Sequence, residues 1–384
     1  MSELSYLEKL LDGVEVEWKS LGDVVNFQRG RRLVKSQLET RGKYAVYQNS
    51  MTPLGYYHEY NVAAQSSFII CAGAAGEIGY SENEFWAADD VHFAITPEYI
   101  NDRFLFHFLL TQKNKISGQV RRASIPRLSK SVIEKLEFPI PCPDNPEKSL
   151  AIQSEIVRIL DKFTALTAEL TAELTAELNM RKKQYNYYRD QLLSFKEGEV
   201  EWKTLGYLGE NLDSKRKPIT SGLREAGSIP YYGASGIVDY VKDYIFDGDF
   251  LLISEDGANL LARNTPIAFS ISGKSWVNNH AHVIKFDSYA ERRYVEYYLN
   301  SIDLSPYISG AAQPKLNKKN LESIRIPNPS PEDKERIVSI LDKFDALTNS
   351  INEGLPREIE LRQKQYEYYR DLLFSFPRPE TASN

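Results

Sequence analysis

Two stretches of the chain carry apolar residues at the three- and four-residue spacing of an amphipathic helix. The first stripe comprises Ile156, Ile159, Leu160, Phe163, Leu166, Leu170 and Leu174. The second comprises Ile337, Ile340, Leu341, Phe344, Leu347, Ile351 and Leu355. Helices with matching stripes pack on each other, so we predict two long helices, with Gly354 and Pro356 breaking or bending the second. The alternative is that each stripe faces its own neighbouring module.

The regions ahead of these helices contain short apolar runs separated by glycine-rich turns such as Gly73-Ala-Ala-Gly76. This pattern is typical of β-strands, which we expect at 67–71, 250–254 and 267–271. Each region also contains a stretch with helical periodicity, at 103–110 and 292–299. We therefore predict that the fold class is α+β, with one module ahead of each long helix.

Internal repeats show that the chain is a tandem duplication. Val16-Glu-Trp-Lys19 returns as Val200-Glu-Trp-Lys203, and Ile159-Leu-Asp-Lys-Phe163 returns as Ile340-Leu-Asp-Lys-Phe344. Gln184-Tyr-Asn-Tyr-Tyr-Arg-Asp190 returns as Gln365-Tyr-Glu-Tyr-Tyr-Arg-Asp371. Between these shared segments the two modules have almost no sequence in common. A shared surface suits two copies of one partner, whereas two different modules suit two different targets.

The repeats divide the chain into five expected segments. They are an N-terminal segment that completes a circular repeat (1–22), a first module (23–145), a central spacer helix (146–197), a second module (198–331), and a distal spacer helix with a C-terminal tail (332–384). The central helix holds three consecutive Thr-Ala-Glu-Leu copies, at 167–178. A four-residue repeat drifts around a helix of 3.6 residues per turn, so we interpret it as a spacer rather than a coiled-coil seam.

Composition excludes several classes of protein. The 384 residues include 47 Lys plus Arg against 53 Asp plus Glu, and a net charge of −6 argues against a protein that coats nucleic acid non-specifically. Cys71 and Cys142 cannot build a disulfide framework. No apolar run is long enough to span a membrane, and the N-terminal residues do not resemble a signal peptide. We therefore expect a soluble cytoplasmic protein without a membrane partner.

Basic residues gather in clusters at corresponding places in the two modules, which favours contact with DNA phosphates and guanine edges. The candidates in the first module are Arg29, Arg31, Arg32, Arg121, Arg122 and Arg127. Those in the second are Lys215, Arg216, Lys217, Asn278, Gln313, Lys315 and Lys318. The alternative is a solvated face for any one cluster and a satisfied turn residue for Asn278. The repeated tyrosines of the helices are expected to pack on helix or partner surfaces rather than on bases.

The shared segments quoted above, together with the Thr-Ala-Glu-Leu run, make the chain resemble the specificity subunit of a type I restriction–modification system, closest to the type IC subgroup. Cys71-Ala-Gly-Ala-Ala-Gly-Glu-Ile-Gly79 resembles one type of target-recognition domain. Ser254-Glu-Asp-Gly-Ala-Asn-Leu260 and Gly273-Lys-Ser-Trp-Val-Asn-Asn-His-Ala-His282 resemble another.

The resemblance implies two target-recognition domains held on two long antiparallel spacer helices with pseudo-two-fold symmetry. Each domain would read one half of a bipartite, asymmetric site in double-stranded DNA. Two methyltransferase subunits would bind the shared segments and methylate adenine N6 with S-adenosylmethionine. Restriction subunits would add ATP- and Mg²⁺-dependent cleavage. The chain itself would be non-catalytic and hold no cofactor.

Motifs of the rival class, an enzyme, are incomplete. Gly273-Lys-Ser275 ends like a phosphate-binding loop, but Ala268 stands where the first glycine is required. Asp190, Glu201 and Lys203 suggest a nuclease triad, yet the first copy has another spacing. His280 and His282 are two potential metal ligands without a nearby cysteine or third histidine. We therefore expect no catalytic, cofactor or metal residues; the alternative function is a stand-alone protein-interaction scaffold.

Overall fold

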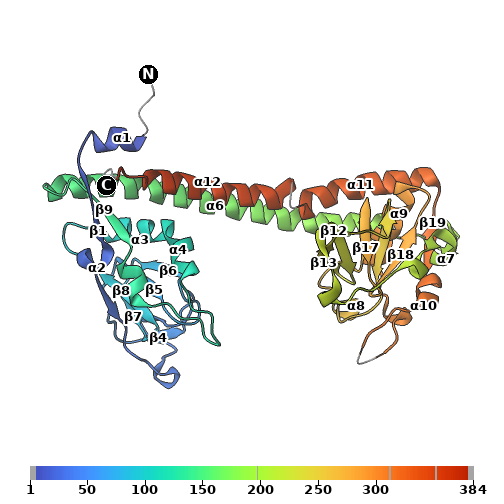
Figure 1. The fold of residues 1–384 in the computed structure, drawn as a ribbon, viewed down its shortest axis with the longest axis horizontal. Coiled ribbons are helices and arrows are strands. Elements are labelled where there is room, and N and C mark those ends of the chain that lie inside the picture. The colour runs from blue at the N-terminus through green and yellow to red at the C-terminus, as the bar shows by residue number, and fades with distance from the viewer. Residues whose placement is uncertain (1–5, 197, 311–312, 351–352, 379–384) are drawn as a thin grey trace. The chain divides into compact units, whose positions relative to one another are not determined.

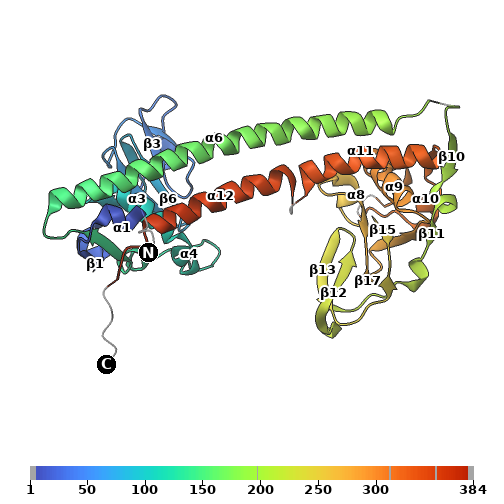
Figure 2. The same ribbon diagram turned by 90° about the horizontal axis from the view of Figure 1, so that it is seen from above.

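The computed structural model describes residues 6–196, 198–310, 313–350 and 353–378. The chain forms two compact units (Figures 1 and 2). The first unit contains residues Met1–Glu173 and Ile359–Asn384, and the second contains Leu174–Glu358. Each unit therefore combines one module with parts of the long helices.

The first unit contains three sheets. β1 (Val16–Ser20) pairs antiparallel with β9 (Glu137–Pro141). A four-stranded sheet has the order β2 (Asn26–Arg29), β8 (Val91–Ile95), β5 (Ser66–Ile70) and β6 (Ile78–Ser81). A three-stranded sheet has the order β4 (Gly55–Tyr57), β3 (Tyr44–Tyr47) and β7 (Phe85–Ala87), with β3 and β7 parallel.

The second unit repeats this topology. β10 (Glu201–Thr204) pairs antiparallel with β19 (Arg325–Asn328). One four-stranded sheet has the order β11 (Glu210–Asn211), β18 (Ala281–Lys285), β15 (Phe250–Ser254) and β16 (Ala268–Ile271). The other has the order β13 (Gly236–Val241), β12 (Ala226–Gly233), β17 (Lys274–Val277) and β14 (Phe246–Asp247), with β12 and β17 parallel. Two modules with almost no common sequence therefore share one fold, and the predicted α+β class is confirmed.

Short helices complete the modules. The first unit has α1 (Tyr6–Leu11), α2 (Leu21–Val24), α3 (Asp102–Thr111), α4 (Lys113–Gly118) and α5 (Lys130–Glu134). The second has α7 (Leu205–Leu208), α8 (Asn259–Ala262), α9 (Tyr289–Ser301) and α10 (Lys318–Glu322). α3 and α9 are the helices predicted at 103–110 and 292–299. The side chains of Asn101 and Ser288 accept hydrogen bonds from backbone N–H groups of the first turns of α3 and α9, the groups that a helix leaves unpaired.

The predicted long helices are present, and the second is interrupted. α6 runs from Pro146 to Leu192. α11 (Pro331–Asn349) and α12 (Gly354–Leu373) make up the distal helix. Gly354 has φ +81°, and a Cβ atom there would lie 2.5 Å from the Ala346 carbonyl oxygen. Only glycine tolerates both, so the break predicted from Gly354 and Pro356 is confirmed. Ile351, which we placed in the second stripe, lies outside the described residues.

Each apolar stripe contacts both its own module and another helix. Ile156 and Leu160 are buried in the core of the first unit, as Ile337 and Leu341 are in that of the second. Further along each long helix, the stripe contacts another long helix in place of the module. Phe163 stacks on Tyr369 and Phe344 stacks on Tyr188, each with 5.6 Å between ring centroids. The prediction of helix pairing and its alternative are thus each correct for part of the stripe.

In the first unit, helix α1 and the described residues that follow α12 pack in the same core. Leu7 and Leu11 of α1 lie in one apolar cluster with Phe374 and Phe376, which follow α12. The Trp18 indole donates a hydrogen bond to the Pro377 carbonyl oxygen at 2.9 Å. In the second unit the residues that follow α6, Leu193 and Phe195, join the core in the same way. No helix among the described residues is long and apolar enough to cross a membrane.

Candidate nucleic-acid interface

The first basic segment of each module occupies the same place in the fold. The Trp86 indole on β7 donates to the Arg31 carbonyl oxygen at 3.0 Å, and Trp276 on β17 donates to that of Lys217 at 2.6 Å. The Arg31 N–H donates to the Ala87 carbonyl, and the Lys217 N–H donates to that of Val277. Each segment is therefore fixed through its backbone, while Arg29, Arg31 and Arg32 in the first module and Lys215 and Lys217 in the second are exposed.

The second basic segment of each module is also placed identically, next to the loop that follows β5 or β15. Gly73 donates to the Pro126 carbonyl at 3.1 Å, and Gly257 donates to the Pro314 carbonyl at 3.2 Å. Isolated bridges join Ala72 to Arg127 in the first module and Asp256 to Lys315 in the second. The predicted candidates Arg127 and Lys315 are therefore structural counterparts.

Most of the predicted DNA-contact side chains are exposed. This group comprises Arg29, Arg31, Arg32, Arg121, Arg122, Arg127, Lys215, Lys217, Gln313, Lys315 and Lys318. Three of them have partners within the module. The Arg29 Nε donates to the Asp89 carbonyl at 2.6 Å, Lys315 pairs with Glu255 at 3.1 Å, and Lys318 pairs with Glu322 at 3.6 Å. Arg29 and Arg31 also border a cavity of 230 Å³ that Tyr60, Asn61 and Trp86 line with others.

Two predicted contacts are placed differently, inside the module. The Arg216 side chain is only 13% exposed, and its Nη1 donates to Glu255 Oε2 at 2.6 Å and to the Ala281 carbonyl at 2.8 Å. Asn278 is 7% exposed, and its Oδ1 accepts a hydrogen bond from the His280 N–H at 2.8 Å. The Asn278 side-chain oxygen is thus bonded within its own loop, which is the arrangement that the alternative interpretation expects. The Arg216 guanidinium is thus bonded to Asp213, Glu255 and Ala281 within the module.

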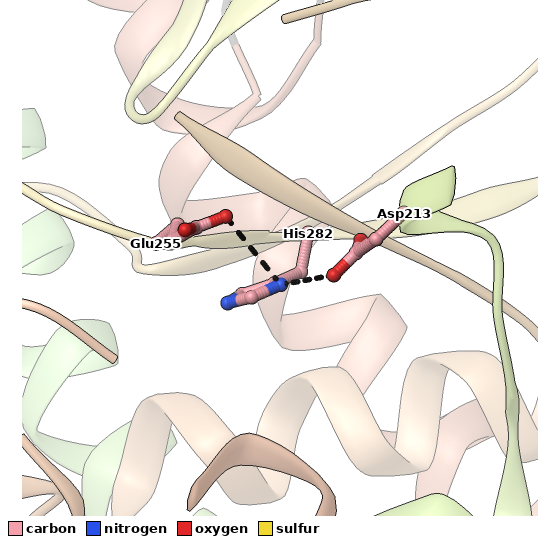
Figure 3. A group of neighbouring side chains, drawn as sticks. All are labelled: Asp213, Glu255 and His282. Carbon is pink, nitrogen blue, oxygen red and sulfur yellow. Dashed lines mark hydrogen bonds and ion pairs between the residues drawn. The ribbon is translucent and has the colours of Figure 1, made fainter. Parts of the chain in front are cut away.

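Arg216 contacts a buried group of three side chains that the sequence did not reveal. This group consists of Asp213, Glu255 and His282 (Figure 3). His282 Nδ1 lies 2.6 Å from Asp213 Oδ2 and 3.8 Å from Glu255 Oε2, and its Nε2 lies 2.7 Å from the Leu316 carbonyl oxygen. A carbonyl oxygen and an ionised carboxylate both accept hydrogen bonds, so both ring nitrogens of His282 face acceptors within the module.

The two carboxylates of this group are bonded to basic side chains. Burial by itself would raise the pKa values of Asp213 and Glu255, but bonds from His282 to Asp213 and from Arg216 and Lys315 to Glu255 hold both below their ordinary values. His280, the other histidine considered as a ligand, pairs separately with Asp256 at 2.8 Å. These residues therefore form a network of ion pairs that joins the two basic segments.

The first module has a different pair at the same position. β2 pairs with β8 so that Arg29 lies opposite His92, and His92 Nδ1 lies 2.7 Å from Cys71 Sγ. Burial raises the pKa of Cys71 to about 12, while burial and then the charge of Arg29 lower the pKa of His92. Cys71 is therefore a protonated thiol in contact with His92, and not a nucleophile. His92 and His282 thus support the same loop with different chemistry.

The incomplete enzyme motifs do not assemble into sites. Gly273 forms a positive-φ turn (φ +78°) and Lys274 and Ser275 enter strand β17, whereas a phosphate-binding loop must lead into a helix. Lys203 pairs with Glu201 at 2.5 Å, and Asp190 pairs with Arg189 at 2.7 Å. These groups are occupied locally by their sequence neighbours.

Comparison with known proteins agrees with this architecture of two modules and long helices. The profile of the type I restriction modification DNA specificity domain matches residues 13–180 and again 197–361. The chain therefore belongs to the family of DNA specificity subunits of type I restriction–modification systems, which are non-catalytic.

Individual relatives span its whole length. The specificity subunit of the type I restriction enzyme EcoR124I/EcoR124II from Escherichia coli is 43% identical over 417 aligned positions, covering 100% of both chains. That of EcoprrI, also from Escherichia coli, is 40% identical over 92% of this chain and 93% of its own. A solved specificity subunit from Mycoplasma genitalium has a TM-score of 0.52 at 17% identity, covering 96% of this chain and 98% of its own. A chain from a solved type I system complex has a TM-score of 0.59 at 15% identity, covering 94% and 97%; both structures support the fold.

Proposed function

We propose that each module reads one half of a bipartite, asymmetric target in double-stranded DNA. The observation that carries this proposal is the matched placement of two basic segments on one fold with two different sequences. Two modules that share one fold but differ in their side chains can each recognise a different base sequence. The five-segment division expected from the repeats, from 1–22 to 332–384, describes these functional parts.

Within the interface, the arginines supply contacts to phosphates and guanine edges, because a guanidinium donates in a fork. We assign this role to Arg29, Arg31, Arg32, Arg121, Arg122 and Arg127 in the first module. Lys215, Lys217, Lys315 and Lys318 hold phosphates in the second, and the exposed amide of Gln313 suits an adenine edge. Arg216 and Asn278 support these segments from within the module.

The shared segments would dock two methyltransferase subunits, which carry S-adenosylmethionine, and restriction subunits with ATP and Mg²⁺ would join through them. The repeated tyrosines support this assignment. Tyr188 and Tyr369 stack within the helix pairs, but their neighbours Tyr187 and Tyr368 are 61% and 64% exposed. Large exposed aromatic groups at equivalent positions of both units suit two copies of one partner.

The salt dependence of DNA binding tests the proposal against a stand-alone protein scaffold. The complex with methyltransferase subunits is titrated onto target DNA over a series of salt concentrations. Each phosphate contact should add about 0.9 to the slope of log K against log salt. Lys217→Ala should therefore flatten the slope by about one contact, whereas Glu335→Gln on α11 should leave it unchanged. Affinity that does not depend on salt would favour the scaffold.

A further inference from the structure

The repeated Ile-Leu-Asp-Lys-Phe motif places an aspartate against the adjacent module in each unit. In the first unit, Asp161 Oδ1 lies 2.9 Å from Arg103 Nε and 2.9 Å from His107 Nε2, both on α3. Arg103 also lies over the Tyr80 ring at 4.4 Å from its centroid. The long helix and the module are thus joined by a directional charged contact as well as by the apolar core.

The second unit reproduces this contact with other residues. Asp342 Oδ1 accepts from Arg293 Nε at 3.0 Å and from the Tyr297 hydroxyl at 2.6 Å, and its Oδ2 accepts from the Tyr289 hydroxyl at 2.7 Å. Arg293 and Tyr297 are four residues apart on α9, as Arg103 and His107 are on α3. Modules that otherwise differ in sequence have thus retained an arginine, and a second donor one turn later, for the same aspartate.

Burial makes both contacts specific. His107 is fully buried, and burial lowers its pKa. Its Nε2 lies against the Asp161 carboxylate, which only accepts, so Nε2 donates to Asp161, while Nδ1 has no hydrogen-bond partner among the described residues. Arg293 is 12% exposed and also pairs with Glu296 and Asp345. Charge-assisted hydrogen bonds at buried side chains require a defined geometry between donor and acceptor. Apolar contacts of Ile156 or Leu160 with the core impose no such direction.

We propose that Asp161 and Asp342 are positioning residues that hold each recognition module at one rotation about its long helix. They thereby set how strictly the complex selects the length of DNA between the two half-sites. This inference rests on the proposed function, because it requires that the two modules read separate half-sites. The aspartates act through module orientation and contact neither bases nor the reacting groups.

The test measures methylation by the assembled complex on a DNA library in which both half-sites are constant and the gap varies by single base pairs. Asp342→Asn keeps the side-chain shape but loses the charge, and Glu335→Gln is the control of equal charge change on α11. Asp342→Asn should raise methylation at neighbouring gap lengths, relative to the preferred one, by about tenfold. The half-site sequences should stay the same.

A double-mutant cycle in the first unit separates positioning from general loss of stability. Arg103→Ala and Asp161→Asn should each broaden the gap preference. The double variant should broaden it no further than Asp161→Asn alone, because replacing Asp161 already removes the ion pair with Arg103. A folded Asp342→Asn or Asp161→Asn complex with the sharp wild-type gap preference would overturn the proposal, as would additive effects in the cycle. A wild-type complex that methylates no two-part site would instead overturn the proposed function.

Discussion

Replacement of Arg216 by alanine distinguishes a structural cation from a DNA contact. Arg216 is 13% exposed and its partner Glu255 is 11% exposed, with 2.6 Å between Nη1 and Oε2. Removing one member of a buried ion pair costs about 3–5 kcal/mol, because the other charge is left without its partner. Lys315, 3.1 Å from Glu255, remains and offsets part of this cost. We therefore expect a loss of about 3 kcal/mol in the free energy of unfolding of the second unit.

A loss of this size is readily measured. Units of 150–250 residues lose roughly 2–4 °C in Tm for each kcal/mol, so Arg216→Ala should lower the unfolding transition of the second unit by roughly 6–12 °C. The matched control is Lys217→Ala, one residue further along the chain. Lys217 is exposed and surface substitutions of this kind change stability by less than about 0.5 kcal/mol. The control should keep its Tm and instead flatten the salt dependence of DNA binding.

Differential scanning calorimetry and salt-dependent DNA titrations on the same two variants give the answer. An Arg216→Ala protein with wild-type Tm and a salt slope reduced by about one contact would refute the structural role of Arg216. It would also show that the ion pairs with Asp213 and Glu255 open when DNA binds.

Three further predictions concern other parts of the chain. Burial raises the pKa of Asp102 to about 6, above the value near 4 of an unfolded chain, so its contribution to stability is present below pH 4 and is lost as the pH rises through 6. In urea unfolding, the free energy of unfolding of Asp102→Asn should therefore equal that of the wild type near pH 4 and exceed it by about 2–3 kcal/mol at pH 8. Equal free energies of unfolding at pH 8 would contradict the burial argument. Deletion of the Thr-Ala-Glu-Leu copy at 171–174 removes about 6 Å of helix, so the methylated motif should keep both half-sites but change its gap by about one or two base pairs; an unchanged gap would rule out a spacer role. Gly354→Ala places a Cβ atom 2.5 Å from the Ala346 carbonyl oxygen at a residue with φ +81°. It should therefore lower the free energy of unfolding of the second unit by at least about 1–2 kcal/mol, measured by thermal unfolding. An unchanged Tm would show that the α11–α12 junction relaxes freely.

Periodicity and repetition were sufficient to predict the long helices, the strands and the interruption of the distal helix. These features depend on residues close together in sequence, such as the stripe that contains Ile156 and Leu160 or the glycine at 354. The strand order and hydrogen-bond register that the two modules share could not be predicted, because they depend on pairing between residues far apart in sequence. Trp86 and Trp276 each donate to a backbone carbonyl, that of Arg31 or of Lys217. Because a backbone contact does not depend on the side chain, the same contact forms with different residues in the two modules.

The candidate site was only partly predictable for a similar reason. Exposed basic clusters are visible in the sequence, but the burial of Arg216 depends on Glu255, which directly follows β15, and on His282, which lies on β18. His282 was recognised as a potential ligand, but its carboxylate neighbours come from β-sheet pairing and not from local spacing. Asp161 and Asp342 could be found as members of a repeated motif. Their contacts with Arg103 and Arg293 depend on how α3 and α9 pack on the long helices, which the sequence does not show.

Sequencing of methylated sites in DNA from cells that express this chain with its methyltransferase subunit tests the central claim most directly. Two separate recognition modules predict one new motif in two parts, separated by a gap of fixed length and unspecified sequence, with N6-methyladenine in each half. Exposed-surface substitutions in one module, such as Arg121→Ala with Arg122→Ala, should relax or abolish recognition of one half only. A continuous single motif, or no new motif when the partner is expressed and bound, would contradict the claim.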